Sequence, residues 1–296
     1  MLDYALLEAL AAVVRDGTFE RAARSLNLTP SAVSQRVKLL EERVGSVLVK
    51  RGQPCVATPS GALLCRHVER VAWLEAELGG HLPDLPGAHA DRPILRVAVN
   101  DDSLATWFID AAGPFCVESG VLLDLVIDDQ DHTAARIRDG SVQGAVTSQA
   151  EPVQGCRSTR LGRMRYHAVC APAFKQQYFA EGLTRAALRQ APCVCFNRKD
   201  ALQERFIRRV ARTELEVPQH WIPHMAGFLR ACETGLGWGM CPERLIARQL
   251  EEGSLVELTP GRGVDIELYW QSWRLSIGWL DRFSNALRAR AAVLLD

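Results

Sequence analysis

The sequence lacks several features that would place it in a large class of proteins. No apolar run approaches the roughly 20 residues that span a bilayer, and Asp3 and Glu8 stand where an export signal would be basic and then continuously apolar. No CxxC pair occurs, and the nine cysteines lie singly in apolar segments such as Cys193-Val194-Cys195. Scattered cysteines of this kind are typical of reduced thiols. These absences predict a cytoplasmic protein with no membrane segment.

Motifs of catalysis and metal binding are also missing. The sequence has no Gly-rich phosphate loop, no GxSxG elbow and no His-Glu metal pattern. His220 and His224 flank a proline that prevents a helical pair of metal ligands. The glycines from Gly235 to Gly239 follow a helical pattern and lead into a strand, the reverse of a dinucleotide fingerprint, so they predict a helix C-terminal turn. We therefore expect no catalytic residues, no metal and no cofactor.

Composition and charge indicate a soluble chain of more than one domain. The 296 residues are 48% hydrophobic and 24% charged, which predicts two or three domains with real cores. The formal net charge is zero. From Met1 to Ser60 eight basic residues stand against six acidic ones. Because phosphate contacts supply most of the affinity for nucleic acid, this small excess does not by itself predict a DNA-binding protein.

The stretch from Phe19 to Arg51 predicts a helix-turn-helix. Phe19 to Leu26 carries small apolar residues at helical spacing, which allow a second helix to approach closely. At the start of the next helix Thr29 and Ser31 offer hydroxyls for an N-cap, and Pro30 suits the first position. A buried stripe of Val33, Val37 and Leu40 follows. Its opposite face is short and polar, as a major-groove recognition helix requires. A helical domain that merely packs on another domain is the alternative.

Longer motifs resemble the N-terminal signature of LysR-type transcriptional regulators. The matching positions are Ala22-Ala23, Leu26, Thr29, Ser31-Ala32-Val33-Ser34, Val37, Leu40-Glu41, Val44-Gly45, Leu48, Arg51 and Thr58-Pro59-x-Gly61. The resemblance implies a winged helix-turn-helix that binds double-stranded promoter DNA, with the wing at 50–58 and with Gly52 and Pro54 as turn residues. It implies base contacts from Ser31, Ser34, Gln35 and Arg36, phosphate contacts from Lys38, Arg51 and Thr58, and further DNA contacts from Thr29 and Pro30.

A long amphipathic helix is predicted after Ser60. Leu64, Val68, Val71, Leu74 and Leu78 step by three or four residues and form an apolar seam. A helix between two domains has little of its own chain to bury this seam against, so we expect the same helix of a second subunit. The LysR resemblance implies the same dimer; packing on the helix's own domain is the alternative. A linker follows, marked by Gly79-Gly80 and by prolines up to Pro93.

The remaining residues alternate strand-like and helical runs, which predicts an α/β fold. The expected strands are 94–99, 122–127, 144–147, 167–171, 193–196, 238–241 and 267–273. The length of this part of the chain suits two α/β lobes with a cleft between them. Ligands in such sheets sit beyond the carboxyl ends of the strands. The LysR resemblance implies a bilobed, periplasmic-binding-protein-like effector domain. The expected chain is therefore an α+β multidomain protein: DNA-binding domain 1–60, linker helix and hinge 61–92, effector domain 93–296, with lobe I at 93–165 and 266–296 and lobe II at 166–265.

The first strand of this domain ends in a polar run that suits an amino-acid ligand. Asn100-Asp101-Asp102-Ser103 precedes a predicted helix from Leu104 to Val117, where Ser103 and Thr106 supply hydroxyls for a carboxylate. Asp101 and Asp102 favour a cation a few ångströms away. Trp107 belongs to the same candidate site. The alternative is structural, because Ser103 also fits an N-cap and both aspartates fit a helix's first turn.

Two further segments are expected to face the same site. Asp128-Asp129-Gln130-Asp131 follows the second strand, and Thr147-Ser148 follows the third. An acidic cluster can hold a guanidinium or an ammonium group, and Asp129 is the candidate ligand here. The alternative reading makes Asp131 the cap of a helix from His132 to Arg138 and leaves Asp128 solvated.

The resemblance narrows along the whole chain to the ArgP/LysG branch of the LysR family, one member of which was described as a chromosome initiation inhibitor. The matching segments are Asn100-x-Asp102 to Trp107, Pro172-x-Phe174, Tyr178-Phe179, Gly182-x-Thr184-Arg185, Leu258 to Gly261 and Leu268 to Trp270. Asp101 departs from the branch, which has a small apolar residue there. The branch implies sensing of L-lysine or L-arginine and control of amino acid export or of lysine and arginine metabolism.

This resemblance also implies the protein's partners. They are promoter DNA, RNA polymerase, a basic amino acid effector and further copies of the chain, as a homodimer and then a homotetramer. The alternatives are a LysR-type regulator with an unrelated effector, an enzyme built on the α/β domain and a free-standing amino-acid-binding protein. The last would need an export signal and leaves the first 60 residues without a role.

Overall fold

The computed structural model describes residues 2–81, 92–128, 133–138, 141–274 and 278–296. The chain divides into two compact units, Met1–Pro93 and Ile94–Asp296. Each unit has its own hydrophobic core. The two units are described separately below, in chain order.

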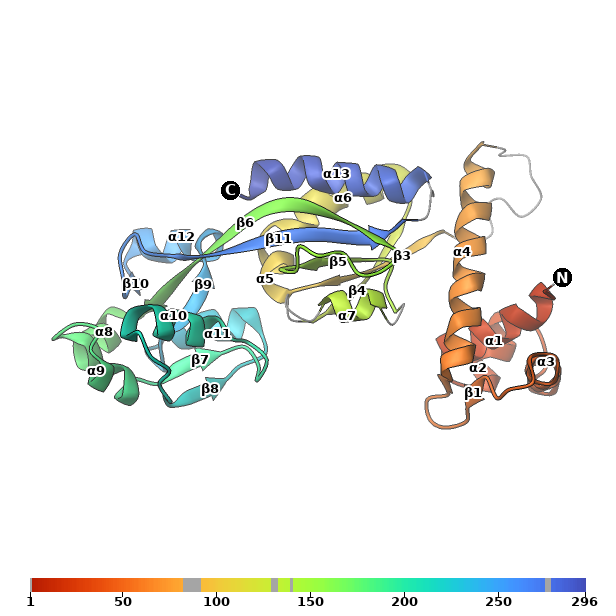
Figure 1. Cartoon of the computed structure of the whole chain (residues 1–296), viewed down its shortest axis with the longest axis horizontal. Coiled ribbons are helices and arrows are strands. Elements are labelled where there is room, and N and C mark those ends of the chain that lie inside the picture. Colours follow the sequence, from red (N-terminus) through yellow and green to blue (C-terminus); the bar gives the residue numbers. More distant parts are fainter. Residues whose placement is uncertain (1, 82–91, 129–132, 139–140, 275–277) are drawn as a thin grey trace. The chain divides into compact units, whose positions relative to one another are not determined.

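The first unit opens with three helices, α1 (Tyr4–Asp16), α2 (Phe19–Ser25) and α3 (Pro30–Val44) (Figure 1). Val33, Val37 and Leu40 are buried as predicted, and they pack with α1 and α2 around a core that includes Leu7 and Leu10. Two short antiparallel strands follow, β1 (Val49–Lys50) and β2 (Val56–Ala57). The predicted helix-turn-helix and its wing are therefore confirmed.

The long predicted helix is also present, as α4 (Pro59–His81). Its apolar seam is packed against the core in the first half of the helix and exposed in the second half. Leu64 and Val68 pack against the core of the first unit, whereas Leu74 and Leu78 are 51% and 47% exposed. The expectation that this helix has little of its own chain to bury against is thus wrong for its first half. The helix also runs through Gly79-Gly80, which the sequence suggested as linker; residues 82–91 lie outside the described part.

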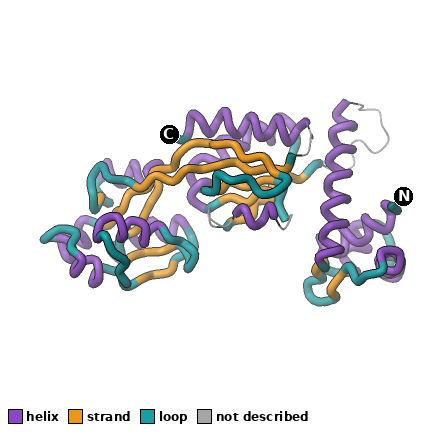
Figure 2. The backbone as a smooth tube through the Cα atoms, viewed as in Figure 1, coloured by secondary structure: helices purple, strands orange, loops and turns teal. Residues whose placement is uncertain are grey.

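The second unit is built on a mixed sheet with the strand order β10-β6-β11-β5-β3-β4. Strands β3 (Ile94–Val99), β4 (Leu122–Ile127) and β5 (Gly144–Thr147) are parallel. Two long antiparallel strands, β6 (Cys156–Cys170) and β11 (Val264–Trp273), continue the sheet. Figure 2 shows both running from the β3–β5 group to the remainder of the unit.

Helices cover the β3–β5 group on both faces. The segment after β3 comprises α5 (Asp101–Ser103), a π-helical turn (Leu104–Phe108) and α6 (Ile109–Ser119). Helix α6 packs with α13 (Gly278–Leu294), where the Phe115 and Phe283 rings lie 5.5 Å apart. The Trp270 indole of β11 lies 5.6 Å from Phe283 and donates a hydrogen bond to Ser284. On the other face α7 (Thr133–Arg138) packs against β5.

The remaining part of this unit contains the parallel pair β7 (Cys193–Cys195) and β8 (Gln219–Trp221), together with β9 (Gly239–Pro242) and β10 (Val256–Glu257). Strands β9 and β10 pair with β6. The helices are α8 (Pro172–Phe179), α9 (Arg185–Gln190), α10 (Leu202–Ala211), α11 (Met225–Glu233) and α12 (Glu243–Glu252). A second core gathers Val194, Phe228 and Cys232. The predicted bilobed α/β architecture is confirmed.

Some predicted elements differ from the structure. The sequence places β6 at 167–171, but the strand starts at Cys156, and both β8 and β10 were not predicted. The helix expected from Leu104 begins at Asp101 and contains a π-helical turn. Gly235 has a left-handed φ of 76° just after α11, as the helix-end interpretation of the glycine run predicts.

Candidate functional site

The outer face of α3 is the candidate DNA-contacting surface. Thr29 caps the helix by accepting a hydrogen bond from the Ala32 N–H at 3.2 Å, and its hydroxyl lies 3.0 Å from that of Ser31. Ser31, Gln35 and Lys38 are exposed, while Ser34 and Arg36 are half-buried. This arrangement presents short polar groups from a helix that the Val33–Val37–Leu40 stripe fixes to its unit.

The wing is fixed to the same unit by the side chains of Glu41 in α3 and of Thr58, which directly precedes α4. The Glu41 carboxylate accepts hydrogen bonds from the N–H groups of Leu48 and Val49, at 2.8 and 3.3 Å. The Thr58 hydroxyl donates to the Val47 carbonyl and accepts from the Gly61 N–H. A Cβ at Gly61 would overlap the Leu48 carbonyl, so the close approach requires glycine. Thr58 thus already serves as a cap, in addition to its predicted contact with phosphate.

Two predicted phosphate ligands also have partners within the unit. The Lys38 ammonium lies 3.8 Å from Glu42, and both side chains are largely exposed. The Arg51 guanidinium lies over the Phe19 ring, 5.2 Å from its centroid. Exposed pairs of this kind contribute little stability, so both cations can exchange these partners for a phosphate.

A second candidate site lies at the carboxyl ends of β3 and β4, where the second unit brings distant segments together. Asn100 and Ser103 directly follow β3 and are 4% and 0% exposed. The Ser103 hydroxyl is buried without a hydrogen-bond partner among the described residues. The π-helical turn starts immediately afterwards, and such turns are frequent at functional sites. Ser103 is therefore a buried hydrogen-bonding group at the position where α/β sheets bind ligands.

The two adjacent aspartates each reach a partner from another part of the unit. Asp101 accepts a hydrogen bond from the Met225 N–H at 3.1 Å and so satisfies the N-terminus of α11. Asp102 accepts a hydrogen bond from the Tyr166 hydroxyl at 2.7 Å, which ties it to the long strand β6. Both carboxylates thus join the β3 end to segments 64 and 124 residues away.

A third carboxylate, that of Asp128 after β4, also contacts a residue from a distant part of the second unit. The Asp128 side chain is 12% exposed and lies 3.1 Å from Arg136 Nε and 3.4 Å from Lys199 Nζ. The expectation that Asp128 is solvated is therefore wrong. Lys199 lies in the loop between β7 and α10. We call Asn100, Asp101, Asp102, Ser103, Asp128, Tyr166, Lys199 and Met225 the interlobe site.

The other predicted effector residues are placed differently. Thr147 is buried and accepts a hydrogen bond from the Gln149 N–H, and Ser148 is half-buried at the end of β5. Trp107 is 1% exposed and packs edge-on to Phe108. The Thr106 hydroxyl donates to the Asp102 carbonyl at 2.6 Å. Asp129 and Asp131 lie outside the described residues.

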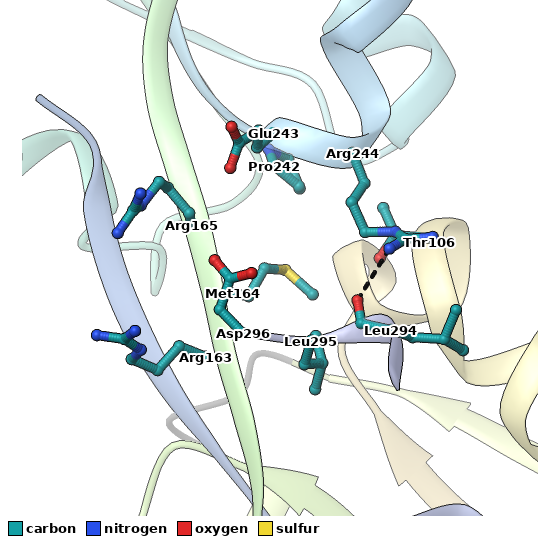
Figure 3. A pocket seen from close by; sticks show the side chains of 10 residues that line it. All are labelled: Thr106, Arg163, Met164, Arg165, Pro242, Glu243, Arg244, Leu294, Leu295 and Asp296. Carbon is teal, nitrogen blue, oxygen red and sulfur yellow. Dashed lines mark hydrogen bonds between the residues drawn. The ribbon is translucent and has the colours of Figure 1, made fainter. Parts of the chain in front are cut away.

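Thr106 also lines a pocket (Figure 3). Its other walls come from β6, from the start of α12 and from the last residues of the chain, with Arg163, Arg165 and Arg244 among them. Its volume is about 60 Å³. None of Asp101, Asp102 and Asp128 lines this pocket.

The described residues show neither a metal site nor a membrane span. No group of three or more His, Cys, Asp or Glu in these ranges could hold a metal ion, and none of the described helices is long and apolar enough to cross a bilayer. The nine cysteines are all free, as predicted. Burial raises the pKa of Cys65 to about 11 and that of Cys170 to about 12, so these thiols stay protonated at neutral pH.

Sequence reasoning missed Tyr166, Lys199 and the N-terminus of α11. No local pattern marks Tyr166, because its partner Asp102 lies 64 residues away. Lys199 gives a weak signal: it follows a strand that ends at Cys195, just as Asp128 follows β4. Applying the strand-end rule to the second lobe as well would have identified Lys199.

Both units match known families. Residues 4–62 match the bacterial regulatory helix-turn-helix proteins of the lysR family, and residues 88–292 match the LysR substrate binding domain. The HTH-type transcriptional regulator ArgP of Pseudomonas aeruginosa is 45% identical, over 98% of this chain and 96% of that protein.

Solved structures agree over the full length. The crystal structure of ArgP from Mycobacterium tuberculosis has a TM-score of 0.84 and 44% identity, and it covers 100% of this chain and 99% of its own. Full-length LysG from Corynebacterium glutamicum with bound effector Arg has a TM-score of 0.73 and 36% identity, covering 99% of each chain.

Proposed function

The chain belongs to the LysR family of bacterial transcriptional regulators, and from this premise we propose that it controls transcription in response to a basic amino acid. The arginine-bound LysG from Corynebacterium glutamicum carries this proposal, since it is 36% identical and covers 99% of the chain. The genes proposed to be regulated are those for amino acid export or for lysine and arginine metabolism.

DNA binding is assigned to α3 and the wing of the first unit. Ser31, Ser34, Gln35 and Arg36 are proposed to contact base edges in the major groove. Lys38, Arg51 and Thr58 are proposed to contact phosphates, with Thr29 and Pro30 at the helix N-terminus, where backbone N–H groups favour an anion. The exposure of Ser31, Gln35 and Lys38 on one face supports this assignment.

A dimer is proposed to present two such helices to the two halves of a promoter site. The second half of α4 supports it, because Leu74 and Leu78 are about half exposed on a long helix. Two dimers would form the proposed tetramer, and RNA polymerase is the proposed partner at the promoter. The proposed boundaries are 1–60 for the DNA-binding domain, 61–92 for the linker and 93–296 for the effector domain.

The effector is proposed to bind at the interlobe site. Asp101, Asp102 and Asp128 supply negative charge for the α-amino group and the side-chain cation of L-lysine or L-arginine. Neutral groups on Asn100, Ser103, Thr147 and Ser148 are the proposed donors for the carboxylate. Thr106, Trp107 and Asp129 complete the predicted set; Thr106 supports the site through its hydrogen bond to the Asp102 carbonyl, and Trp107 supports it through packing against Phe108.

The effector can control transcription if it binds two arrangements of the lobes with different affinity. The proposed lobe I comprises 93–165 and 266–296, and lobe II comprises 166–265. The Asp101–Met225 and Asp102–Tyr166 hydrogen bonds join segments assigned to different lobes. A ligand that competes for these carboxylates therefore changes how the lobes are held, and with it the spacing and bending of the bound DNA.

Calorimetric titration of the full-length protein tests the effector class. We expect saturable binding of L-lysine or L-arginine, no binding of L-leucine, and loss of binding in Asp102→Ala and Ser103→Ala. Asp110→Ala serves as a control, because it removes an exposed carboxylate on α6. Failure of the wild-type protein to bind either basic amino acid contradicts the proposed effector and leads to a screen of other metabolites.

DNA binding is tested separately by selecting duplexes from a random-sequence library with the purified protein. A selected site with two related half-sites supports the dimeric regulator. Recovery of no preferred sequence contradicts it, whatever the outcome of the effector titration.

A further inference from the structure

Lys199 is one of only four lysines in a chain with 35 basic residues, the others being Lys38, Lys50 and Lys175. Its ammonium lies 3.4 Å from the Asp128 carboxylate. Asp128 follows β4, whereas Lys199 follows β7 in the segment assigned to lobe II. A primary ammonium on a flexible four-carbon chain is also the side-chain group of free lysine. The chain therefore places an effector-like cation on an acidic residue of the proposed effector site.

The backbone that carries Lys199 is held firmly. The Asn197 side chain accepts hydrogen bonds from the N–H groups of Lys199 and Asp200, at 2.7 and 3.2 Å. The Asp200 carboxylate accepts from those of Phe196 and Leu202, at 3.2 and 3.0 Å. With the loop fixed at both ends, the lysine side chain can leave Asp128 without any change in the backbone around it.

Arg136 and Lys199, the cations that the described residues bring to Asp128, are not equivalent. Arg136 comes from α7, in the same lobe as Asp128, and its Nε lies 3.1 Å from one carboxylate oxygen. Lys199 approaches the other oxygen at a longer distance, and its side chain is 55% exposed. Exposed ion pairs are weak because water screens them and the long side chain loses freedom. Lys199 is thus the displaceable partner of a carboxylate that is itself 12% exposed.

We propose that Lys199 is an intramolecular competitor of the effector: in the effector-free chain its ammonium occupies the Asp128 oxygen that the side-chain cation of a basic amino acid takes on binding. The proposal rests on the proposed function. Displacement also breaks a contact between segments assigned to the two lobes, so it links binding to their arrangement. Arginine should displace Lys199 better than lysine does, because a guanidinium can bind a carboxylate through two N–H groups.

Calorimetry with a matched pair of variants tests the competition. Lys199→Met keeps the length of the side chain and removes its charge. Arg198→Met makes the same charge change one residue away, where the guanidinium lies over the Trp221 ring. Since an exposed pair is worth at most about 1 kcal/mol, we expect Lys199→Met to raise the affinity for L-arginine and L-lysine about two- to fivefold. Arg198→Met should stay within twofold, and Asp128→Asn should lose at least tenfold.

A second measurement follows Lys199 directly. Reductive methylation with ¹³C-formaldehyde keeps the charge of lysine and gives one NMR signal from each of the four lysines and one from the N-terminal amine. The Lys199 signal is the one missing in Lys199→Met. We expect Asp128→Asn to shift this signal in the effector-free protein. Adding L-arginine to the wild type should move it toward the same position.

The outcomes separate the two proposals. Tighter binding by Lys199→Met, together with an arginine-dependent shift of the Lys199 signal, supports the competitor. If the wild type binds arginine but Lys199→Met binds it equally or more weakly, the proposed function stands and the competitor role is overturned. If neither the wild type nor Lys199→Met binds a basic amino acid, both are overturned, although the Asp128→Asn shift still reports whether the ion pair exists.

Discussion

The two units hold their candidate contacts by opposite means. In the first unit the groups that shape the DNA-contacting surface bond to near neighbours, as Thr29 does with Ala32 and Thr58 does with Gly61. In the second unit the site residues bond across the fold: Asp102 to Tyr166, and Asp101 to Met225. The recognition helix is therefore shaped locally, whereas the interlobe site exists only when distant strands have come together.

This difference predicts how substitutions act in each unit. The polar residues on the outer face of α3 are exposed and lie apart from the core stripe, so changing them should alter DNA binding without altering stability. The carboxylates of the interlobe site also connect strands and helices. Changing these carboxylates should affect both stability and effector binding.

Leu40→Ala should give the largest effect and test whether the two units are energetically separate. Leu40 is 2% exposed in the core of the first unit, and a buried leucine truncated to alanine costs about 2–5 kcal/mol. We expect DNA binding to be lost while arginine binding is retained, measured by urea unfolding and calorimetry. The neighbouring Leu39, which is 39% exposed, provides the control: Leu39→Ala should change stability by about 0.5 kcal/mol or less. Equal effects of the two would contradict the observed core.

Tyr166→Phe should show that a site contact in the second unit also contributes to stability. It removes the 2.7 Å hydrogen bond to the Asp102 carboxylate, and bonds to charged groups contribute about 1.5–3 kcal/mol. Six of the seven tryptophans lie in this unit, so their fluorescence reports its unfolding in urea. Tyr178→Phe, a change on the half-buried ring beside Phe174, should have little effect. An unchanged midpoint in Tyr166→Phe would argue that the bond contributes nothing.

Gln35→Ala and Lys38→Ala should separate base recognition from phosphate binding. Loss of a base contact costs about 1–3 kcal/mol and relaxes the preference at one position of the site. Loss of a phosphate contact weakens binding to all sequences. It also reduces the slope of the logarithm of the binding constant against the logarithm of the salt concentration by about one. Fluorescence anisotropy at several salt concentrations distinguishes the two. Neither variant should change stability, since both residues are exposed; a clear loss of stability would break the contrast with Tyr166.

The smallest effect is expected from ion pairs between β6 and β11. A hydrogen bond from Arg165 lowers the pKa of Asp265, and one from Arg160 lowers the pKa of Glu267. Folded pKa values below the unfolded ones mean that the stabilisation is present above about pH 4 and is lost as the pH falls through the folded values. Asp265→Asn with Glu267→Gln should therefore flatten the acid side of the stability profile. A steeper profile would contradict the sign of both shifts.

The same contrast explains which elements the sequence predicts. The bounds of β3, β4 and β5 agree with their apolar runs, both for β3 and β5 inside the sheet and for β4 at its edge. The first half of β6 escaped prediction because it is rich in arginine. Arg160 and Arg165 pair with Glu267 and Asp265 on β11, about 100 residues away, and a local pattern carries no sign of such partners. The three residues of β8 are too few to show a period.

The sequence predicted only part of the candidate site, because local patterns show strand ends and helix caps but not the distant residues that bond to them. The strand-end rule identified the polar run from Asn100 to Ser103, and the structure places it where other segments converge. Sequence alone gave Asp128 no partner, because Lys199 lies 71 residues further along the chain. The capping role of Thr29, by contrast, follows from its own neighbours and was predicted correctly.

The most direct test of the account is the affinity of the full-length protein for its selected DNA, measured with and without saturating L-arginine. Coupling between sites is typically 1–3 kcal/mol, so we predict that arginine changes the DNA affinity by about 5- to 150-fold. At the arginine concentration that just saturates the wild type, the change should be much smaller in Asp128→Asn. Identical DNA affinity with and without arginine in a protein that binds both would contradict the proposed regulation.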